Sequence, residues 1–287
     1  MFRIEIMQHS RQLLRRSIGS LAIGLLLLLT GCGGGGGAKP TVSQLQASTL
    51  RYGQTAVVQV AGKYMRNDMT AESTSCTGAA FRDDSTPDRA VLTCQVTATG
   101  PLLLTIRAAD GEVLHRDSLS VPLPQVLFVT SEGSIEIELD PAAAPVTVSN
   151  FLGYVNRGFY RDTLFHRVIP GFVVQGGGYT TTLAKKDGQL APIPLESNRG
   201  LLNMRSTVAM ARTSEPNSAT SEFFVNLVDN AQLDYQNPNN PGYAVFGRVV
   251  KGMDVADTIA AKPNATVGAA QNVPVDDVLI SLALQTR

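Results

Sequence analysis

One segment of the sequence places a permanent cation and an amide among alternating apolar residues. The segment covers residues 165–177 and reads Phe-His-Arg-Val-Ile-Pro-Gly-Phe-Val-Val-Gln-Gly-Gly. Val168 and Val174 suit a half-buried strand, and the Pro-Gly pair between them interrupts the run as a bulge or tight turn does. Arg167 stays charged at every physiological pH, so its donors need a partner. With Gln175 nearby, the segment predicts a binding site for a polar group such as a peptide carbonyl.

Four later blocks give this segment a context. They are Gly200–Arg205, Val208–Arg212, Asn217–Asn226 and Gly242–Val249. Together with residues 165–177 they resemble the cyclophilin family of peptidyl-prolyl cis-trans isomerases, in the same order and at similar intervals. The resemblance covers about residues 126–285 and is strongest toward the short bacterial periplasmic members. It implies a mainly β fold, with a closed eight-stranded antiparallel barrel that two helices cap.

The resemblance also implies roles for individual residues. Carried over by position, Arg167 would be the catalytic arginine. The proline pocket would be lined by Phe172, Val173, Phe224, Leu233 and Tyr243, and the peptide backbone would be contacted by Gln175, Ala211 and Arg212. His166 has three open interpretations: a donor to a substrate carbonyl, a support for Arg167, or a core histidine. Taken singly, each apolar residue of the set could equally belong to the core.

Some positions depart from the pattern of animal cyclophilins. Val173 replaces a common methionine, Tyr243 a histidine, Arg212 an asparagine and Gln232 an aromatic residue. Glu222 stands where the family usually has glutamine. Its carboxylate could pair with Arg167 and compete with the substrate, so we expect Glu222→Gln to raise kcat/KM on an Ala-Pro peptide.

The reaction that the resemblance implies needs few catalytic groups. Rotation about a peptide bond meets a barrier of about 18–20 kcal/mol, and no proton transfer or covalent step is needed. An arginine that donates near the imide would favour the twisted transition state. We therefore expect no cofactor. A metal site is not expected either, because no Cys-x-x-Cys spacing exists and His9, His115 and His166 are scattered.

The N-terminus carries an export signature. Basic residues precede the apolar run Ile18–Leu29, which is shorter than the about 20 residues that a membrane span needs. Leu29-Thr30-Gly31-Cys32 resembles the bacterial lipobox, which implies a signal peptide over residues 1–31 and acyl chains on Cys32. The alternative is an ordinary secretory signal with an incidental cysteine. Gly33, rather than Asp, follows the cysteine, and the resemblance to bacterial lipoproteins then implies the outer membrane, with the protein facing the periplasm.

The two other cysteines form an even pair. Cys76 and Cys94 would form a disulfide in an oxidising compartment, worth about 3 kcal/mol in the chain-entropy model. Two buried free thiols are the alternative.

The remaining chain divides by composition. Residues 32–40 are a glycine-rich tether, and residues 41–121 contain short strand-like runs at 56–60, 90–96 and 102–106. Asp110-Gly111 indicates a hairpin. These features predict a small β-sandwich of immunoglobulin type, acting as a spacer or docking module. Pro122-Leu123-Pro124 marks the boundary to an isomerase domain over residues 125–287.

The second domain has clear local signals. Strands are expected at 125–129 and 134–139 around the turn at 131–133, because apolar and acidic residues alternate there. A helix should begin at Pro145 and reach about Asn156, and a second should follow Gly252.

The balance of charges argues against one class of binding partner. Lys plus Arg and Asp plus Glu both number 24 in 287 residues, which argues against nucleic acid as the main partner. We expect a monomer that acts on proline-containing polypeptides of the envelope and assists their folding. Two other functions stay open: a peptide-binding holdase with incidental isomerase activity, and an envelope assembly factor whose β-domain selects the partner.

Overall fold

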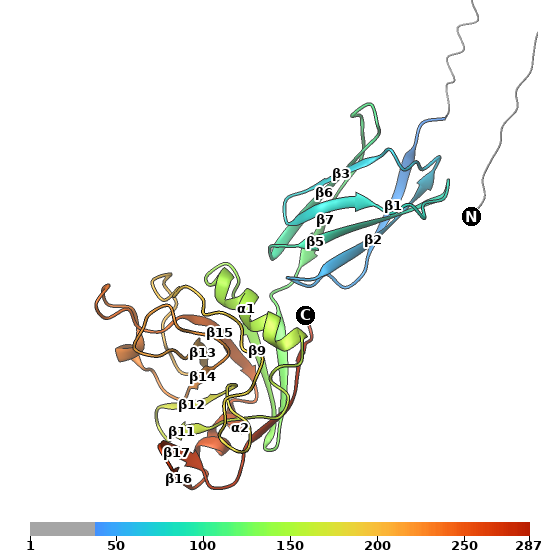
Figure 1. Cartoon of the computed structure of the whole chain (residues 1–287). Coiled ribbons are helices and arrows are strands. Elements are labelled where there is room, and N and C mark those ends of the chain that lie inside the picture. Colours follow the sequence, from blue (N-terminus) through green and yellow to red (C-terminus); the bar gives the residue numbers. More distant parts are fainter. Residues whose placement is uncertain (1–37) are drawn as a thin grey trace, which may run out of the picture. The chain divides into compact units, whose positions relative to one another are not determined.

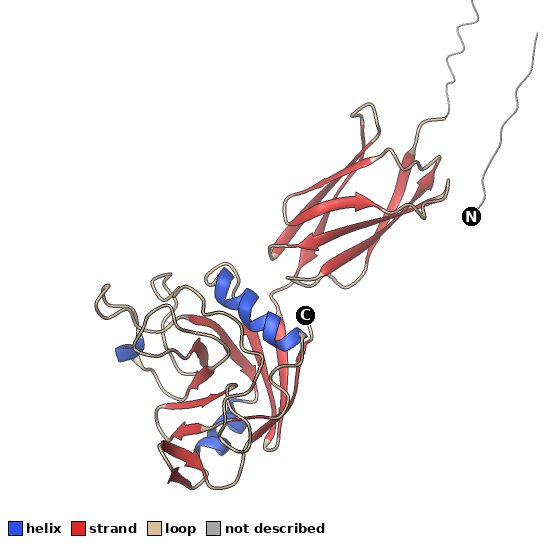
Figure 2. Cartoon of the chain, viewed as in Figure 1, coloured by secondary structure: helices blue, strands red, loops and turns tan. Residues whose placement is uncertain are grey.

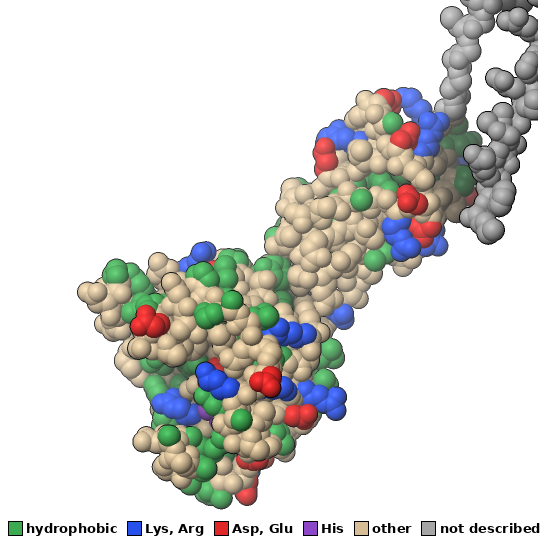
Figure 3. Space-filling model, viewed as in Figure 1, with side chains coloured by type: hydrophobic (Ala, Val, Ile, Leu, Met, Phe, Trp, Pro, Cys, Tyr) green, Lys and Arg blue, Asp and Glu red, His purple; other side chains and the backbone are tan. Residues whose placement is uncertain are grey.

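The structure is a computed structural model that describes residues 38–287 (Figure 1). The predicted signal peptide, Cys32 and the run of glycines after it lie outside the described residues. Within the described part of the chain, no helix is long and apolar enough to cross a membrane. Figure 3 shows acidic and basic side chains interspersed on the visible face, in keeping with the balanced charge.

The first seven strands form two antiparallel sheets around one apolar core. The strands are β1 (Thr41–Ala47), β2 (Thr55–Lys63), β3 (Thr70–Ser73), β4 (Cys76–Phe81), β5 (Arg89–Val96), β6 (Gly100–Arg107) and β7 (Val113–Val121). The sheet orders β1-β2-β5-β4 and β3-β6-β7 are those of the seven-stranded immunoglobulin arrangement. Val58, Leu92 and Leu104 are among the buried residues between the sheets. The expected hairpin at Asp110-Gly111 is confirmed, since it joins β6 to β7.

Cys76 and Cys94 lie on neighbouring strands of one sheet. Their sulfur atoms are 1.94 Å apart, which is bonding distance, and their Cα atoms are 5.6 Å apart. In antibody domains the disulfide instead connects the two sheets. A disulfide between Cys76 and Cys94 would link β4 to β5 within one layer.

A second, curled sheet contains nine antiparallel strands (Figure 2). Its strands are β8 (Gln125–Thr130), β9 (Gly133–Leu139), β10 (Thr163–Leu164), β11 (Arg167–Ile169), β12 (Val173–Gly176), β13 (Thr207–Met210), β14 (Phe223–Asn226), β15 (Val245–Lys251) and β18 (Leu279–Gln285). Their order is β10-β18-β8-β9-β15-β13-β14-β12-β11. A separate hairpin consists of β16 (Asn264–Val267) and β17 (Ala270–Pro274), and a short 3-10 helix covers Ala231–Leu233.

The curled sheet has one strand more than the eight expected. The extra strand arises because the chain between β10 and β11 leaves the ladder at Phe165-His166. Leu164 accepts a backbone hydrogen bond from Gly177 and donates one to Tyr179, both directly after β12. These two bonds connect β10, at one end of the sheet, to the chain that follows β12 near the other end. The two ends of the curled sheet therefore meet.

Two helices cover the curled sheet, as predicted. Helix α1 (Pro145–Asn156) begins at its proline, whose fixed φ suits the first helical position. Helix α2 (Met253–Ala260) follows Gly252, which has a φ of 86°. In Figure 1 the helices lie toward opposite ends of the sheet.

The start of α1 depends on a residue far away in the sequence. Its N-cap residue, Ala144, offers no side-chain hydrogen bond. Instead, the buried carboxylate of Glu196 accepts hydrogen bonds from the amides of Val146 and Thr147, at 3.3 and 2.8 Å, and from the Thr147 hydroxyl at 2.8 Å. Glu196 thus supplies the acceptor that the helix start lacks.

Strands β12 and β14 are buried on both faces. Val174, Phe223 and Val225 point into the main core, where Phe223 stacks on Phe128 with ring centroids 5.2 Å apart. Their neighbours Val173 and Phe224 belong to a separate small cluster on the other face. Because side chains alternate along a strand, these two strands connect the core to a second apolar surface.

Candidate active site

The register of three strands brings the predicted site residues together. Arg167 of β11 pairs with Gln175 of β12, which in turn pairs with Phe224 of β14. Residues that are opposite each other in a ladder project to the same face. The arginine, the amide and the aromatic ring therefore project from the same face of the sheet.

A pocket of about 420 Å³ opens on this face. It is lined by Arg167, Phe172, Val173, Gln175, Ala211, Arg212, Phe224, Leu233 and Tyr243. All of them were candidate residues from the sequence. Val173 and Phe224 are almost fully buried and form the apolar cluster that the partly buried Phe172, Leu233 and Tyr243 pack against. The arrangement is an apolar pocket with a cation and an amide at its edge.

Hydrogen bonds connect the cation to a carboxylate through the amide. Arg167 Nη1 donates to Gln175 Oε1 at 3.3 Å, and Gln175 Nε2 donates to Glu222 Oε2 at 3.0 Å. His166 Nε2 lies 3.2 Å from the same oxygen of Glu222. Within residues 38–287, no carboxylate forms an ion pair with Arg167. The expected direct pairing of Glu222 with Arg167 is therefore wrong, because Gln175 lies between them. The rise in kcat/KM expected for Glu222→Gln depended on that pairing and no longer follows.

The environment of Glu222 keeps it ionised. Burial raises the pKa of its carboxyl group, but the hydrogen bond and charge of His166, the hydrogen bond of Gln175 and the charge of Lys185 together bring that pKa below its ordinary value of 4.5. The carboxylate is therefore charged at neutral pH and accepts hydrogen bonds only.

His166 faces away from the apolar pocket. Its side chain is 11% exposed, its ring packs on Tyr179 with centroids 4.4 Å apart, and its Nδ1 has no hydrogen-bond partner in the described structure. His166 and Arg167 line a neighbouring hollow of about 450 Å³ together with residues of the β16–β17 hairpin. Of the three interpretations of His166, this placement favours indirect support of Arg167 through Glu222.

Two of the unusual residues contact each other. The guanidinium of Arg212 lies 4.6 Å from the ring centroid of Tyr243, and Arg212 Nε donates to the Gly242 carbonyl at 2.9 Å. The Tyr243 ring meets Phe224 edge to face at 5.6 Å. The two replacements thus form one wall of the pocket as a pair. Gln232 is exposed, bonds to Asn230 and does not line the pocket.

Three buried asparagines support the pocket, and sequence reasoning missed them. Asn226 Nδ2 donates to Asn203 Oδ1, and Asn230 Nδ2 donates to both Asn226 Oδ1 and the Phe172 carbonyl. The network holds the loop after β14, which carries Leu233. An asparagine at the end of an apolar strand, as in Phe223–Asn226, is the only local signal of it.

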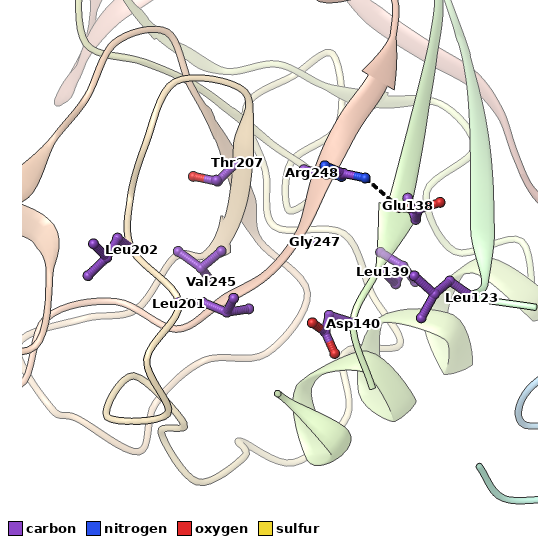
Figure 4. A pocket seen from close by; sticks show the side chains of 10 residues that line it. All are labelled: Leu123, Glu138, Leu139, Asp140, Leu201, Leu202, Thr207, Val245, Gly247 and Arg248. Atoms are coloured by element: carbon purple, nitrogen blue, oxygen red, sulfur yellow. Dashed lines mark hydrogen bonds and ion pairs between the residues drawn. The ribbon is translucent and has the colours of Figure 1, made fainter. Parts of the chain in front are cut away.

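A third hollow, of about 280 Å³, lies elsewhere on the curled sheet (Figure 4). Leucines and Val245 line it together with three charged residues, of which Arg248 and Glu138 pair with each other at 3.0 Å and Asp140 is a second acid. No group of three or more His, Cys, Asp or Glu side chains in the described structure could hold a metal ion. Unlike this hollow, the pocket beside Arg167 offers a ligand a cation that has no ion-pair partner in the described structure.

The apolar pocket, the arginine at its edge and the curled sheet are the features of a cyclophilin. The family described as "Cyclophilin type peptidyl-prolyl cis-trans isomerase/CLD" matches residues 125–283, more than half of the chain. The chain belongs to this family of peptidyl-prolyl cis-trans isomerases.

Curated relatives support the same assignment. The chain is 53% identical over 158 residues to peptidyl-prolyl cis-trans isomerase A of Dickeya dadantii, covering 55% of this chain and 82% of the relative. It is 52% identical over 151 residues to an isomerase of Acinetobacter baylyi, covering 53% and 79%. It is 47% identical over 157 residues to isomerase B of Escherichia coli, covering 54% and 95%. The chain therefore acts as an isomerase of peptide bonds before proline.

Proposed function

We propose that Arg167 is the catalytic residue of this isomerase and that the pocket beside it holds the proline ring of the client. The observation that carries the proposal is the position of a cation without an ion-pair partner in the described structure at the edge of an apolar pocket. Val173, Phe224 and Tyr243 hold the ring by apolar contact, while the chain before proline stays free to turn.

The guanidinium acts on the twisted state. As the bond turns, resonance is lost and the lone pair of the imide nitrogen becomes an acceptor. A preorganised donor stabilises this state more than the planar one, which lowers the barrier. Because no group must change its protonation, the residues of the pocket need no cofactor.

The test is isomerisation of an Ala-Pro peptide by the chain that starts at residue 38. We expect Arg167→Ala to lower kcat/KM by about 100-fold or more, the loss typical of removing one transition-state donor. Glu215→Gln, an exposed substitution, is the matched control. Full activity of Arg167→Ala would contradict the proposed role, and full protection of a folding client by that variant would favour the holdase function.

We also propose that the protein is a lipoprotein of the bacterial envelope whose clients are exported polypeptides. The lipobox-like sequence ending in Cys32 supports acylation, and the position of Cys76 and Cys94 on neighbouring strands, with Cα atoms 5.6 Å apart, suits a disulfide that would persist in an oxidising compartment. Labelling with a fatty-acid probe should mark the wild type and fail with Cys32→Ser. Labelling that persists in the variant would contradict acylation at this residue.

The strands between residues 41 and 121 offer a spacer or docking module between anchor and enzyme. Deletion of residues 41–121 should leave the isomerase rate on a short peptide unchanged, because the residues of the pocket all follow residue 166. Loss of client association with retained peptide activity would favour partner selection by this part of the chain.

A further inference from the structure

Glu222 is anchored from three sides. Its side chain is 19% exposed, and one carboxylate oxygen, Oε2, faces both His166 Nε2 and Gln175 Nε2. The buried Gly178 leaves room for it: a Cβ at that position would lie 2.4 Å from the Glu222 Cγ. These contacts hold the Glu222 carboxylate in one position, next to Gln175.

The hydrogen bonds from Arg167 to Glu222 can run in only one direction. A guanidinium only donates and an ionised carboxylate only accepts, whereas the Gln175 amide can do either. Glu222 takes the NH₂ group of Gln175, so the Gln175 carbonyl must face Arg167. Turning the amide over would set two acceptors against each other at Glu222 and two donors at Arg167.

A glutamine at position 222 would remove this constraint. It both donates and accepts, so it could bind either end of the Gln175 amide. In one of the two arrangements, Gln175 would turn its NH₂ group toward Arg167 and the bond at 3.3 Å would be lost. The carboxylate is therefore the group that makes one arrangement of Gln175 obligatory.

We propose that Glu222 is a positioning residue: through Gln175 it holds the Arg167 guanidinium in the orientation that meets the client. This inference rests on the proposed role of Arg167. His166 also contacts Glu222, and the charges of Lys185 and Glu222 are close enough to act on Glu222 and on the Tyr179 hydroxyl, respectively. Only Gln175 connects the carboxylate to Arg167 by hydrogen bonds in the described structure.

The experiment compares three side chains of similar length at position 222. Glutamate accepts only, glutamine donates and accepts, and methionine donates nothing and accepts only weakly through its sulfur. Exchange NMR on an Ala-Pro peptide, with the chain that starts at residue 38, gives the isomerisation rate on the enzyme separately from Kd. We expect Glu222→Gln to slow the rate about two- to threefold and Glu222→Met about five- to tenfold, as the loss of one restraining hydrogen bond implies, with Kd unchanged within about twofold.

Gly178→Ala is a second perturbation that leaves the carboxylate intact. The added methyl group would displace the Glu222 side chain from Gln175, so we expect a loss like that of Glu222→Met. Glu215→Gln should leave the rate unchanged, because this exposed carboxylate lies outside the network.

The decisive arm repeats the series in the Gln175→Ala background. If Glu222 acts through Gln175, its substitution has no further effect on the rate there. An equal loss in both backgrounds, a rise in Kd without a slower rate, or a faster Glu222→Gln enzyme would overturn the inference while leaving Arg167 in its role. An unchanged rate in Arg167→Ala would instead overturn the proposed function and this inference together.

Discussion

Replacing Glu196 should loosen the start of helix α1. The Glu196 side chain is 3% exposed and 50 residues away from Val146 in sequence. In Glu196→Ala, the amide and hydroxyl of Thr147 lose their acceptor, and Thr147 is fully buried. Each buried donor without an acceptor lowers the free energy of unfolding by about 1–3 kcal/mol, whereas the Val146 amide can form a hydrogen bond with water. We therefore expect a loss of about 3 kcal/mol.

The conservative variant separates hydrogen bonding from charge. Glu196→Gln keeps one oxygen, which can stay at the position of Oε2 and accept both bonds from Thr147. It loses the weaker bond to Val146, the ion pair with the half-exposed Arg199 at 3.7 Å and the attraction between a negative charge and the helix start, about 1 kcal/mol together. Alanine should thus cost clearly more than glutamine.

Hydrogen exchange measured by mass spectrometry suits this prediction, because the chain has no tryptophan to report on unfolding and two separate cores that could unfold independently. Protection of the α1 amides should fall in Glu196→Ala, less in Glu196→Gln, and stay unchanged in the exposed control Glu215→Gln. Equal losses for alanine and glutamine would refute the capping argument, and so would a loss below about 1 kcal/mol for alanine.

Three further predictions concern other contacts. The pKa of Glu222 is lower in the folded chain than its ordinary value of 4.5. The ionised carboxylate therefore stabilises the folded chain fully above pH 4.5, and this stabilisation is lost as the pH falls through the folded pKa. Urea unfolding between pH 6 and 3 should show a steeper acid loss for wild type than for Glu222→Gln; parallel curves would contradict this. A disulfide between Cys76 and Cys94 would close a loop of 18 residues, so reduction should then destabilise the β4–β5 sheet by about 3 kcal/mol, and the reductant should have no effect on the Cys76→Ala/Cys94→Ala variant. Arg212→Ala and Tyr243→Ala should each raise KM, with a coupling of about 1 kcal/mol in a double-mutant cycle, because the cation lies over the ring. Strictly additive effects would show that the contact contributes nothing to binding.

Local patterns in the sequence predicted much of the fold. Pro145 marks a helix start because its ring presets φ, and the alternation in Gly133–Leu139 marks a strand because one face is buried. Arg167 and Gln175 are eight residues apart across a tight turn, so their pairing is also a local event. The resemblance to cyclophilins supplied the remaining members of the pocket.

Non-local partners could not be predicted in the same way. Glu222 was expected against Arg167 because their family positions are close, yet it lies against Gln175 and His166. The hydrogen bonds of the asparagine network and of the Glu196 cap also join residues between 4 and 58 positions apart. A hydrogen bond depends on tenths of an ångström, and no pattern of residue types specifies distances at that scale.

The sequence by itself determined the family, the apolar pocket and the cation at its edge, because these follow from residue types in a fixed order. Only the tertiary structure decided which groups each charged side chain contacts. The register of β12 against β14 places the Glu222 carboxylate beside the NH₂ group of Gln175, one hydrogen bond away from Arg167. A hydrogen bond forms only between atoms in direct contact, so the role of a carboxylate depends on which donor lies next to it.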